Sequence, residues 1–222
     1  NVTCFSYGRE GNRESEISKS VAEALGYEWT FVRYSEGLWY DWWREKGMED
    51  YIDFASNFTS LAHPQDWPAT RKLLTTEDPT NVVFVPGHTG DFISGGHIPE
   101  ELMSKTSKND LKKIIETILS HHYILWDWRE HNKELVKSFE KRIKQTIGAS
   151  SPKDQLEEVI AYNRWELENR QAKYIVNSLR VYEYFGAEWM IPLWDYELID
   201  FFEKVPLSFR INKNYTMKLF EI

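Results

Sequence analysis

The pattern of apolar and polar residues predicts a strand, a helix and a second strand within the first 35 residues or so. Residues 2–8, VTCFSYG, are rich in strand-forming side chains and end at Gly8. Asn12 then has the position of a helix N-cap, and Gly26 stands where a helix-terminating glycine is expected. One helical face between them is apolar: Ile17, Val21, Ala24 and Leu25. Residues 28–34, EWTFVRY, predict the second strand, so the unit implies parallel pairing through a right-handed crossover.

A third strand is predicted over residues 80–87, TNVVFVPG. This segment is apolar throughout, which is typical of a strand buried on both faces of a parallel sheet. The preceding segment, residues 35–80, is rich in aromatic residues and contains proline. It indicates helices around 38–60 and 66–75.

The residues after 107 predict helices only. Two apolar stripes have helical spacing, the first made by Leu111, Ile114, Ile115, Ile118 and Leu119 and the second by Leu135, Phe139, Ile143 and Ile147. A further helix is expected to begin with Ser151 as its N-cap and Pro152 at the first helical position. A short last helix is expected over 196–206 and ends before Pro206.

The predicted fold class is therefore α/β, with a Rossmann-like parallel sheet and its helices in residues 1–106 and a mostly helical part in residues 107–222. We find no internal repeat and no low-complexity linker, so the two parts are expected to share one core. The chain starts in a predicted strand without an initiator Met, and it stops at MKLFEI in what resembles a helix. We therefore expect a fragment of a longer protein.

Composition and charge narrow the choice of partners and compartment. The 222 residues carry a net charge of −8, which argues against non-specific binding to nucleic acid. No run approaches the roughly 18–20 apolar residues that a membrane span needs, so no membrane partner is expected. Cys4 is the single cysteine, which excludes an intramolecular disulfide and suits a reducing cytoplasm. Assembly into a homo-oligomer is left open.

The loop after the third predicted strand is the strongest candidate for chemistry. In open parallel sheets ligands bind beyond the carboxyl ends of the strands, so residues 7–13, 34–40 and 86–97 are the relevant loops. The third loop contains Gly87, Gly90, Gly95 and Gly96, which allow backbone amides to approach an anion closely. Asp91 can hold Mg²⁺ that bridges phosphate oxygens. An ordinary strand-to-helix turn is the alternative interpretation.

Other groups of residues are weaker candidates for a functional site. His88, Asp91 and His97 are a valid transition-metal ligand set, but their spacing is loose and no HExxH or paired-cysteine motif supports it. Residues 179–195 place Glu183, Glu188 and Asp195 among aromatics. Such a carboxylate either pairs with a base such as Arg180 or binds a cationic substrate. The cluster WYDWW at 39–43 indicates packing, or a platform for a substrate ring.

Three separated stretches together resemble the synthetase domain of the asparagine synthetase family, which includes the β-lactam synthetases and has the N-type ATP pyrophosphatase fold. CFSYG followed by ESEISKSVAEALGYEW resembles the family's second strand and helix. Residues 82–97, VVFVPGHTGDFISGGH, are similar to the signature VVLSGEGxDExFGGY. Residues 185–206, FGAEWMIPLWDYELIDFFEKVP, are similar to GLExRxPFLDxxxVxFxxxLP, and TMKLF loosely matches the K-x-x-L lysine motif. The matches cover most of the chain.

The resemblance implies an ATP-dependent, amide-forming ligase. A small-molecule carboxylate would be activated as an acyl-adenylate with release of pyrophosphate, and a nitrogen donor that the sequence does not identify would then attack. Phe5, Ser6 and Tyr7 would lie beside the adenine, largely through backbone groups. Gly87 and Gly90 would face the phosphates, and Asp91 would bind Mg²⁺–pyrophosphate. Lys218 would stabilise charge that develops in the transition state.

The chain also departs from the family pattern. The SGGxDS pyrophosphate loop and the strand before it are absent, which would leave a gap between the strand at 2–8 and the one at 82–86. The glutaminase domain is also missing. His88 and Phe92 stand where the signature has acids, and the family's Asp/Arg pair falls at Tyr174 and Asn177. These departures leave aspartate in question as the substrate. They keep two alternatives open: a non-catalytic module of the same fold, and a metal-dependent hydrolase.

Overall fold

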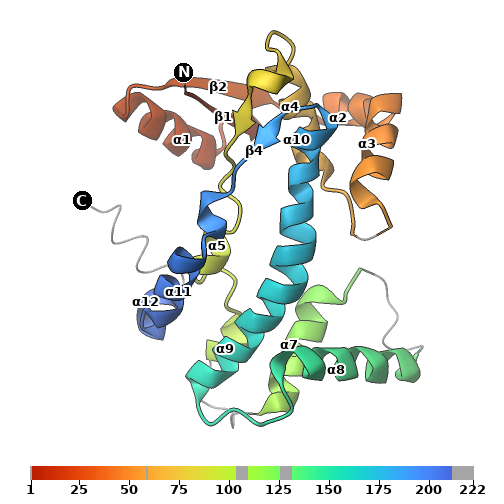
Figure 1. The fold of residues 1–222 in the computed structure, drawn as a ribbon, viewed down its shortest axis with the longest axis vertical. Helices are drawn as coiled ribbons and strands as arrows, with labels where there is room; N and C mark the ends of the chain where they lie inside the picture. Colours follow the sequence, from red (N-terminus) through yellow and green to blue (C-terminus); the bar gives the residue numbers. More distant parts are fainter. Residues whose placement is uncertain (1, 59, 104–109, 126–131, 212–222) are drawn as a thin grey trace. The chain divides into compact units, whose positions relative to one another are not determined.

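A computed structural model of the chain describes residues 2–58, 60–103, 110–125 and 132–211 (Figure 1). The chain divides into two compact units. Unit 1 consists of residues 1–84 and 177–190, and unit 2 consists of residues 85–176 and 191–222. Both units are built mainly from helices, and the described strands all pair in parallel. The mixed α/β class predicted from the sequence is confirmed.

Unit 1 begins with the predicted strand–helix–strand unit, made of β1 (Thr3–Gly8), α1 (Arg13–Ala24) and β2 (Glu28–Arg33). The strands pair in parallel from Thr3 opposite Glu28 to Gly8 opposite Arg33. The side chain of Asn12 caps α1 by accepting a hydrogen bond from the Ser15 amide at 2.8 Å. After the helix, Gly26 has the left-handed φ of 73° that lets the chain turn back toward β2. These features are as predicted.

The face of α1 that packs on the strands differs from the prediction. Ile17, Val21 and Leu25 are about half exposed or more, whereas Ser15 and Ala22 are buried. Ser18 lies on the same inward face, where its hydroxyl accepts hydrogen bonds from Ser6 at 2.9 Å and from the Trp29 indole at 3.2 Å. These small side chains let the helix lie close to the strands, and a two-stranded sheet offers no further surface to cover the larger residues.

The rest of unit 1 is a set of short helices around a second pair of strands. Its elements are α2 (Glu36–Trp43), α3 (Lys46–Ser56), the 3₁₀ turns Pro64–Asp66 and Pro79–Asn81, α4 (Trp67–Leu73), β3 (Val83–Phe84), α10 (Arg180–Tyr184) and β4 (Glu188–Trp189). The Phe84 ring stacks on Tyr182 at 4.4 Å and meets the edge of Phe5 at 5.9 Å. The helical content predicted for 38–60 and 66–75 is confirmed, with a break between α2 and α3.

The prediction for the third strand is wrong in two respects. Only two residues form β3, and Val83 and Val85 are 47% and 59% exposed rather than buried on both faces. Its partner β4 comes from a region that was predicted to hold helices only. The Met190 amide bonds the Phe84 carbonyl at 2.8 Å, and the Glu188 amide bonds Val82 at 3.1 Å. A strand of two residues is too short to produce a recognisable alternation in the sequence.

The described strands form two separate pairs, β1 with β2 and β3 with β4. A full Rossmann-like sheet is therefore not present in the part of the chain that the structure describes. The resemblance predicted a gap between the strand at 2–8 and the one at 82–86. β1 and β3 belong to different sheets, and the structure does not test whether a strand would lie between them.

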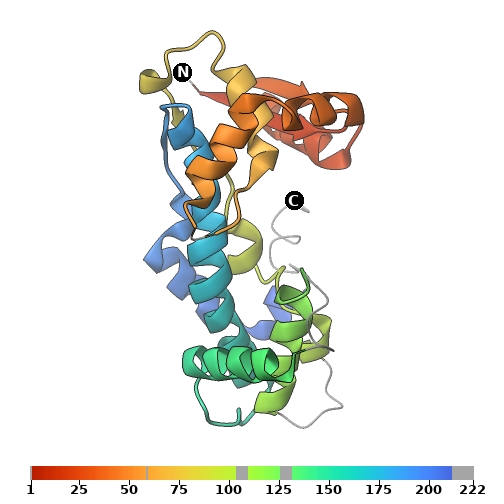
Figure 2. The same ribbon diagram turned by 90° about the vertical axis from the view of Figure 1, so that its right-hand side faces the viewer.

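Unit 2 is helical, and Figure 2 shows it from a second side. Its elements are α5 (Gly90–Ile93), α6 (Glu100–Met103), α7 (Leu111–His122), α8 (Lys133–Ile147), α9 (Gln155–Glu166), a π-helical segment (Leu167–Ile175), a 3₁₀ turn (Pro192–Trp194), α11 (Tyr196–Lys204) and α12 (Leu207–Arg210). A further 3₁₀ turn, Val176–Leu179, follows the π-helical segment where the chain passes from unit 2 to unit 1. Helices α7, α8 and α9 pack together around a core that includes Ile114, Ile118, Ile143 and Tyr162. The two apolar stripes predicted after residue 107 are therefore confirmed.

Of two helix boundaries predicted in this part of the chain, one is correct and one is wrong. The last predicted helix is observed as α11, capped by the Asp195 side chain and ending before Pro206. By contrast, α9 begins at Gln155 rather than at Pro152, because the Asp154 side chain accepts the Glu157 amide at 2.9 Å. Glu157 in turn accepts the Lys153 amide at 2.8 Å. Among the described residues, no helix is long and apolar enough to cross a bilayer.

Candidate functional site

The segment 85–97 follows β3 and forms a tight turn into α5. The Gly90 amide bonds the Gly87 carbonyl at 3.3 Å, and the Ile93 amide bonds Thr89 at 3.0 Å. Farther on, the Gly96 amide bonds the Asp91 carbonyl at 2.8 Å. Asp91 is exposed in the first turn of α5. The predicted Mg²⁺ ligand therefore stands on a fixed backbone with its side chain toward solvent.

The glycines of this segment are required, or allowed, for different structural reasons. A Cβ atom at Gly87 would meet nothing within 4 Å, so a ligand can approach its backbone. At Gly95 the φ is 88°, and a Cβ would lie 2.3 Å from the Arg210 carbonyl oxygen. A Cβ at Gly90 would lie 3.2 Å from the Leu193 side chain. Gly95 is thus a glycine because of its contact with α12, a correction to the prediction that it serves anion approach. Gly87 keeps the open face that the prediction requires.

Thr89 is a feature of this segment that sequence reasoning missed. It has a left-handed φ of 74°, which is uncommon for a residue other than glycine and is strained for a β-branched one. The residue is 6% exposed, and its hydroxyl has no hydrogen-bond partner among the described residues. A strained backbone and an unpartnered buried hydroxyl are typical of ligand-binding positions. Nothing in the sequence marks Thr89 beyond its place one residue before Gly90.

The predicted site residues fall in different parts of the chain. Phe5, Ser6 and Tyr7 lie in β1 of unit 1, whereas Gly87, Gly90 and Asp91 lie in unit 2. The side chain of Phe5 packs on Phe84, that of Ser6 bonds Ser18, and that of Tyr7 bonds Asp66. Lys218 lies outside the described residues. The structure therefore brings Gly87, Gly90 and Asp91 together and describes the β1 group separately.

A buried network in unit 1 surrounds Asp66, which is 5% exposed. It accepts a short hydrogen bond from the Tyr7 hydroxyl, and its other oxygen lies 3.4 Å from His63 Nδ1. Burial and the nearby carboxylate raise the pKa of Tyr7 far above its ordinary value, so Tyr7 is a neutral donor. Tyr34 donates to the Gln65 carbonyl at 2.7 Å and accepts the Ala69 amide at 3.1 Å. This network connects β1 to the start of α4.

A second buried network lies in unit 2 around Glu166, which is 1% exposed. Its Oε1 is 2.5 Å from His97 Nδ1 and accepts from Arg170 Nη1 at 2.8 Å. Gln171 Nε2 lies 3.2 Å from the same oxygen. The π-helical segment that starts at Leu167 allows residues four and five positions after Glu166 to reach it together. Sequence reasoning missed Glu166, because 69 residues separate it from His97.

Two pKa shifts define the charge of this network. Burial acts to raise the pKa of Glu166, but the hydrogen bond from His97 and the charge of Arg170 outweigh it, so the pKa lies below its ordinary value. Burial lowers the pKa of His122 to about 4. His122 Nε2 lies 2.8 Å from the Tyr162 hydroxyl and 3.9 Å from Glu166 Oε2. At neutral pH Glu166 is a carboxylate and His122 is a neutral imidazole.

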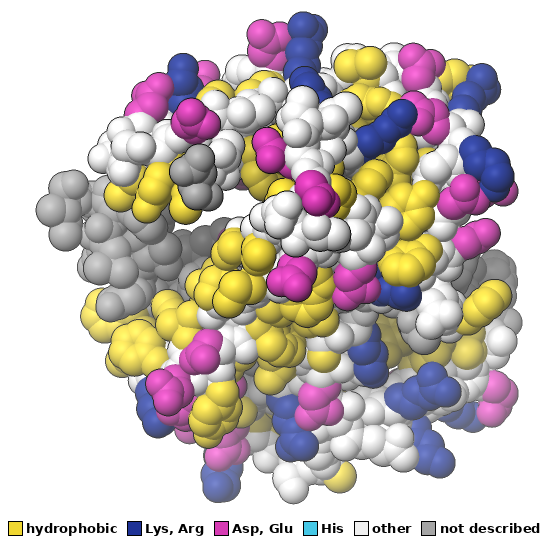
Figure 3. Space-filling model, turned by 45° about the horizontal axis from the view of Figure 1, so that its top comes forward, with side chains coloured by type: hydrophobic (Ala, Val, Ile, Leu, Met, Phe, Trp, Pro, Cys, Tyr) yellow, Lys and Arg dark blue, Asp and Glu magenta, His cyan; other side chains and the backbone are white. Residues whose placement is uncertain are grey.

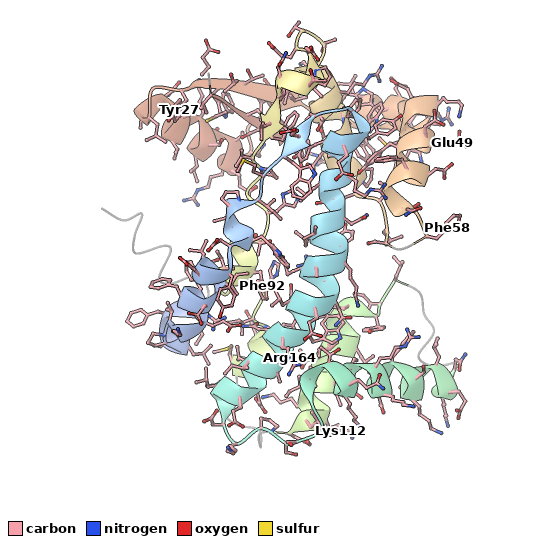
Figure 4. The ribbon with its side chains drawn as sticks, viewed as in Figure 1. Tyr27, Glu49, Phe58, Phe92, Lys112 and Arg164 are labelled. Atoms are coloured by element: carbon pink, nitrogen blue, oxygen red, sulfur yellow. The ribbon has the colours of Figure 1, made fainter. Side chains whose placement is uncertain are left out.

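The transition-metal alternative finds no support in this geometry. Within the described ranges, no group of three or more His, Cys, Asp or Glu side chains is arranged to hold a metal ion. His97 uses Nδ1 to bond Glu166, and its ring lies beside Phe92 with centroids 6.3 Å apart. Phe92 of α5 is labelled in Figure 4. The structure therefore does not bring His88, Asp91 and His97 together as a ligand set.

The remaining candidates have structural roles. Arg180 Nε lies 3.6 Å from Glu183, which also accepts from the Trp189 indole at 3.1 Å, so the predicted pairing is observed. Trp39 and Trp42 pack near Tyr34, whereas Trp43 is 52% exposed. Hydrophobic side chains are also visible between charged ones on the face drawn in Figure 3. The cluster at 39–43 is therefore partly packing and partly surface.

Comparison of the chain with protein-family models, with curated proteins and with solved structures identifies no match.

Proposed function

We propose that this chain is the synthetase part of an ATP- and Mg²⁺-dependent ligase that adenylates a small-molecule carboxylate and joins it to nitrogen as an amide. The observation that carries the proposal is the contact between the two signature stretches, residues 82–97 and 185–206. In unit 1 the first stretch supplies β3 and the second supplies its partner β4. In unit 2 Gly90 of the first stretch lies against Leu193 of the second, and α5 contacts α11.

This contact supports the resemblance because the two stretches are about a hundred residues apart in the sequence. The resemblance was drawn from residue patterns in each stretch separately. A chance match to two motifs would not require them to be neighbours. The parallel pairing of β3 with β4 also puts the segment 85–97 at the carboxyl end of a strand, where ligands of open parallel sheets bind.

The proposed roles follow from the chemistry of the described residues. The open backbone of Gly87 accommodates the phosphates or the adenylate, and the unpartnered Thr89 hydroxyl donates a hydrogen bond to an anionic oxygen. The exposed Asp91 carboxylate is the kind of oxygen ligand that Mg²⁺ takes. When bound, the ion would neutralise charge on pyrophosphate. Phe5, Ser6, Tyr7 and Lys218 keep the roles that the resemblance implies.

The proposal extends to the fold and the cellular setting. The two strand pairs would belong to one Rossmann-like parallel sheet, with the strand that carries the SGGxDS loop between β1 and β3. The reaction would take place in the cytoplasm, with no nucleic-acid or membrane partner.

The test is ATP–pyrophosphate exchange by the full-length protein with Mg²⁺ and a panel of carboxylates that includes aspartate. Exchange should depend on one of the carboxylates, and Asp91→Ala should lower it by about 100-fold or more, because a lost metal ligand removes charge stabilisation from the transition state. Asp53→Ala, at an exposed aspartate of α3, is the matched control and should leave exchange unchanged. An Asp91→Ala protein with normal exchange would contradict the assignment.

A second candidate function is a non-catalytic module that keeps the fold. The observation in its favour is Phe92, which stands at an acidic position of the signature and is 5% exposed, packed beside His97. The buried phenyl ring cannot replace the signature's acidic side chain as a ligand. The module would bind Mg²⁺–ATP, if at all, without exchange. Carboxylate-dependent exchange in the full-length protein would rule it out.

A further inference from the structure

His97 and Glu166 in unit 2 form a pair whose geometry is that of a histidine base held by a carboxylate. Glu166 is 1% exposed, whereas the His97 side chain is 24% exposed. The Glu166 carboxylate lies 2.5 Å from Nδ1, so the neutral ring carries its proton on Nδ1 and keeps the lone pair on Nε2. Within the described residues, the polar contacts of the imidazole are all at Nδ1. With its proton on Nδ1 the ring donates to Glu166 Oε1, to which Arg170 Nη1 and Gln171 Nε2 also donate. Nε2 is therefore the nitrogen that can take up a proton from a ligand.

The surroundings hold the pair in a defined charge state. Arg170 Nη1 lies 2.8 Å from Glu166 Oε1 and 3.0 Å from His97 Nδ1, and Gln171 Nε2 donates to the same carboxylate. His122, from α7, faces Glu166 Oε2 at 3.9 Å and bonds Tyr162 of α9. The groups that face His97 are thus one carboxylate, one guanidinium and one neutral imidazole. The carboxylate stays ionised and can stabilise a positive charge on His97.

The pair is attached to the candidate ATP-binding segment. His97 directly follows Gly96, whose amide bonds the Asp91 carbonyl at 2.8 Å. Gly95 is fixed against the backbone of α12, where no other residue fits. The ring of His97 also packs beside Phe92 of α5. The backbone that carries Asp91 and the backbone that carries His97 therefore form one rigid segment.

We propose that His97 is the general base of the amide-forming step and that Glu166 is its positioning residue. This assignment rests on the proposed function. The attacking nitrogen forms a bond to the acyl carbon of the adenylate, the bond from that carbon to the phosphate oxygen breaks, and AMP leaves with the electron pair. The proton lost by the nitrogen passes to His97 Nε2. Glu166 keeps the Nδ1 proton in place and stabilises the imidazolium.

The decisive experiment separates the two half-reactions in the full-length protein. ATP–pyrophosphate exchange reports adenylation, which needs no nitrogen. Amide formation with ammonium requires loss of protons from the nitrogen, whereas hydroxylamine is mostly unprotonated at neutral pH and is a stronger nucleophile. His97→Gln should keep exchange within about twofold and lower ammonium-dependent amide formation about 100-fold or more, with hydroxamate formation largely retained. Retained exchange also shows that the variant is folded.

Two further variants, a control at His121 and a substitution of Glu166, test the assigned roles separately. His121→Gln, at an exposed histidine that pairs with exposed Glu101, should leave both half-reactions unchanged. Glu166→Gln should lower amide formation. It should also change the acidic limb of the pH profile of amide formation, because the imidazolium then lacks the carboxylate that stabilises its charge. An unshifted acidic limb would indicate that Glu166 has only a structural role and would contradict the pair.

A spectroscopic measurement tests the pair without any substrate. Nitrogen NMR of His97 in the wild-type protein should show the tautomer with the proton on Nδ1, and an Nε2-protonated ring would overturn the assignment. Normal ammonium-dependent amide formation by His97→Gln, or none by the wild type, would also overturn it while leaving adenylation intact. If the wild type lacks exchange altogether, the proposed function itself fails and this role fails with it.

Discussion

Thr89 has a strained backbone conformation and a buried hydroxyl without a hydrogen-bond partner among the described residues. Its φ of 74° places a β-branched side chain in the left-handed region, and its buried hydroxyl bonds nothing among the described residues. Left-handed strain of this kind costs about 1–3 kcal/mol. Because the hydroxyl has no hydrogen bond within the described residues to offset this cost, we interpret Thr89 as a position at which a ligand binds.

The substitution Thr89→Gly separates stability from function at this position. Glycine removes the strain but adds about 0.4–1 kcal/mol of unfolded-state entropy, so the free energy of unfolding should stay equal or rise by up to about 2–3 kcal/mol. ATP–pyrophosphate exchange should nevertheless fall about tenfold or more, since a hydrogen bond to a charged group contributes about 1.5–3 kcal/mol. Denaturant unfolding and the exchange assay measure the two effects. Exchange at the wild-type rate would show that the hydroxyl binds no anion.

Among the elements, α7 and α9 are joined by a polar contact that makes their packing sensitive to pH. His122 of α7 is neutral in the fold, with its pKa lowered to about 4 mainly by burial. The unfolded chain binds a proton at this position below about pH 6.5, whereas the folded chain does so only below about pH 4. Stability from this residue is therefore fully present above pH 6.5 and decreases as the pH falls toward 4. Glu166 acts in the same direction at lower pH, because its pKa is also lowered.

The substitution His122→Phe should flatten the dependence of the unfolding free energy on pH between 6.5 and 4. The phenyl ring keeps the apolar contact with Trp165, whose ring centroid lies 4.8 Å from that of His122. The exposed His121→Gln is the control and should keep the wild-type slope. Denaturant unfolding at several pH values measures the slope of the unfolding free energy against pH. An unchanged slope in His122→Phe would contradict the burial of a neutral imidazole.

The sequence predicted those elements whose determinants are local. The Asn12 cap, the apolar stripe of α7 and the stop before Pro206 each depend on residues within a few positions of one another. The inward face of α1 was wrong because Ser15, Ser18 and Ala22 pack closely, which a hydrophobicity pattern does not register. β4 was missed because its partner β3 lies about a hundred residues away.

The same distinction applies to the candidate site. Asp91 and Gly87 became candidates because glycines and a carboxylate close behind an apolar segment form a local pattern, and their proposed roles stay predictions. The pairing of His97 with Glu166 depends on a helix 69 residues away and on the π-helical segment that follows Glu166. No local sequence pattern predicts a π-helical segment, so the contact between these groups was recognised only in the structure.

For the whole molecule, the proposed function joins two signature stretches, a candidate ATP-binding segment and a proposed base for the second half-reaction. Its central claim is that the carboxylate is activated through AMP rather than through phosphate. A ligase of the proposed kind should therefore release AMP and pyrophosphate, and the carboxylate oxygen lost in amide formation should remain on AMP.

The most direct test is the full reaction with a carboxylate labelled with oxygen-18, followed by mass spectrometry of the nucleotide and phosphate products. Activation through an acyl-adenylate should leave one oxygen-18 atom in the phosphate of AMP for each amide formed. Label in inorganic phosphate together with formation of ADP would contradict adenylation, whatever the effects of the substitutions.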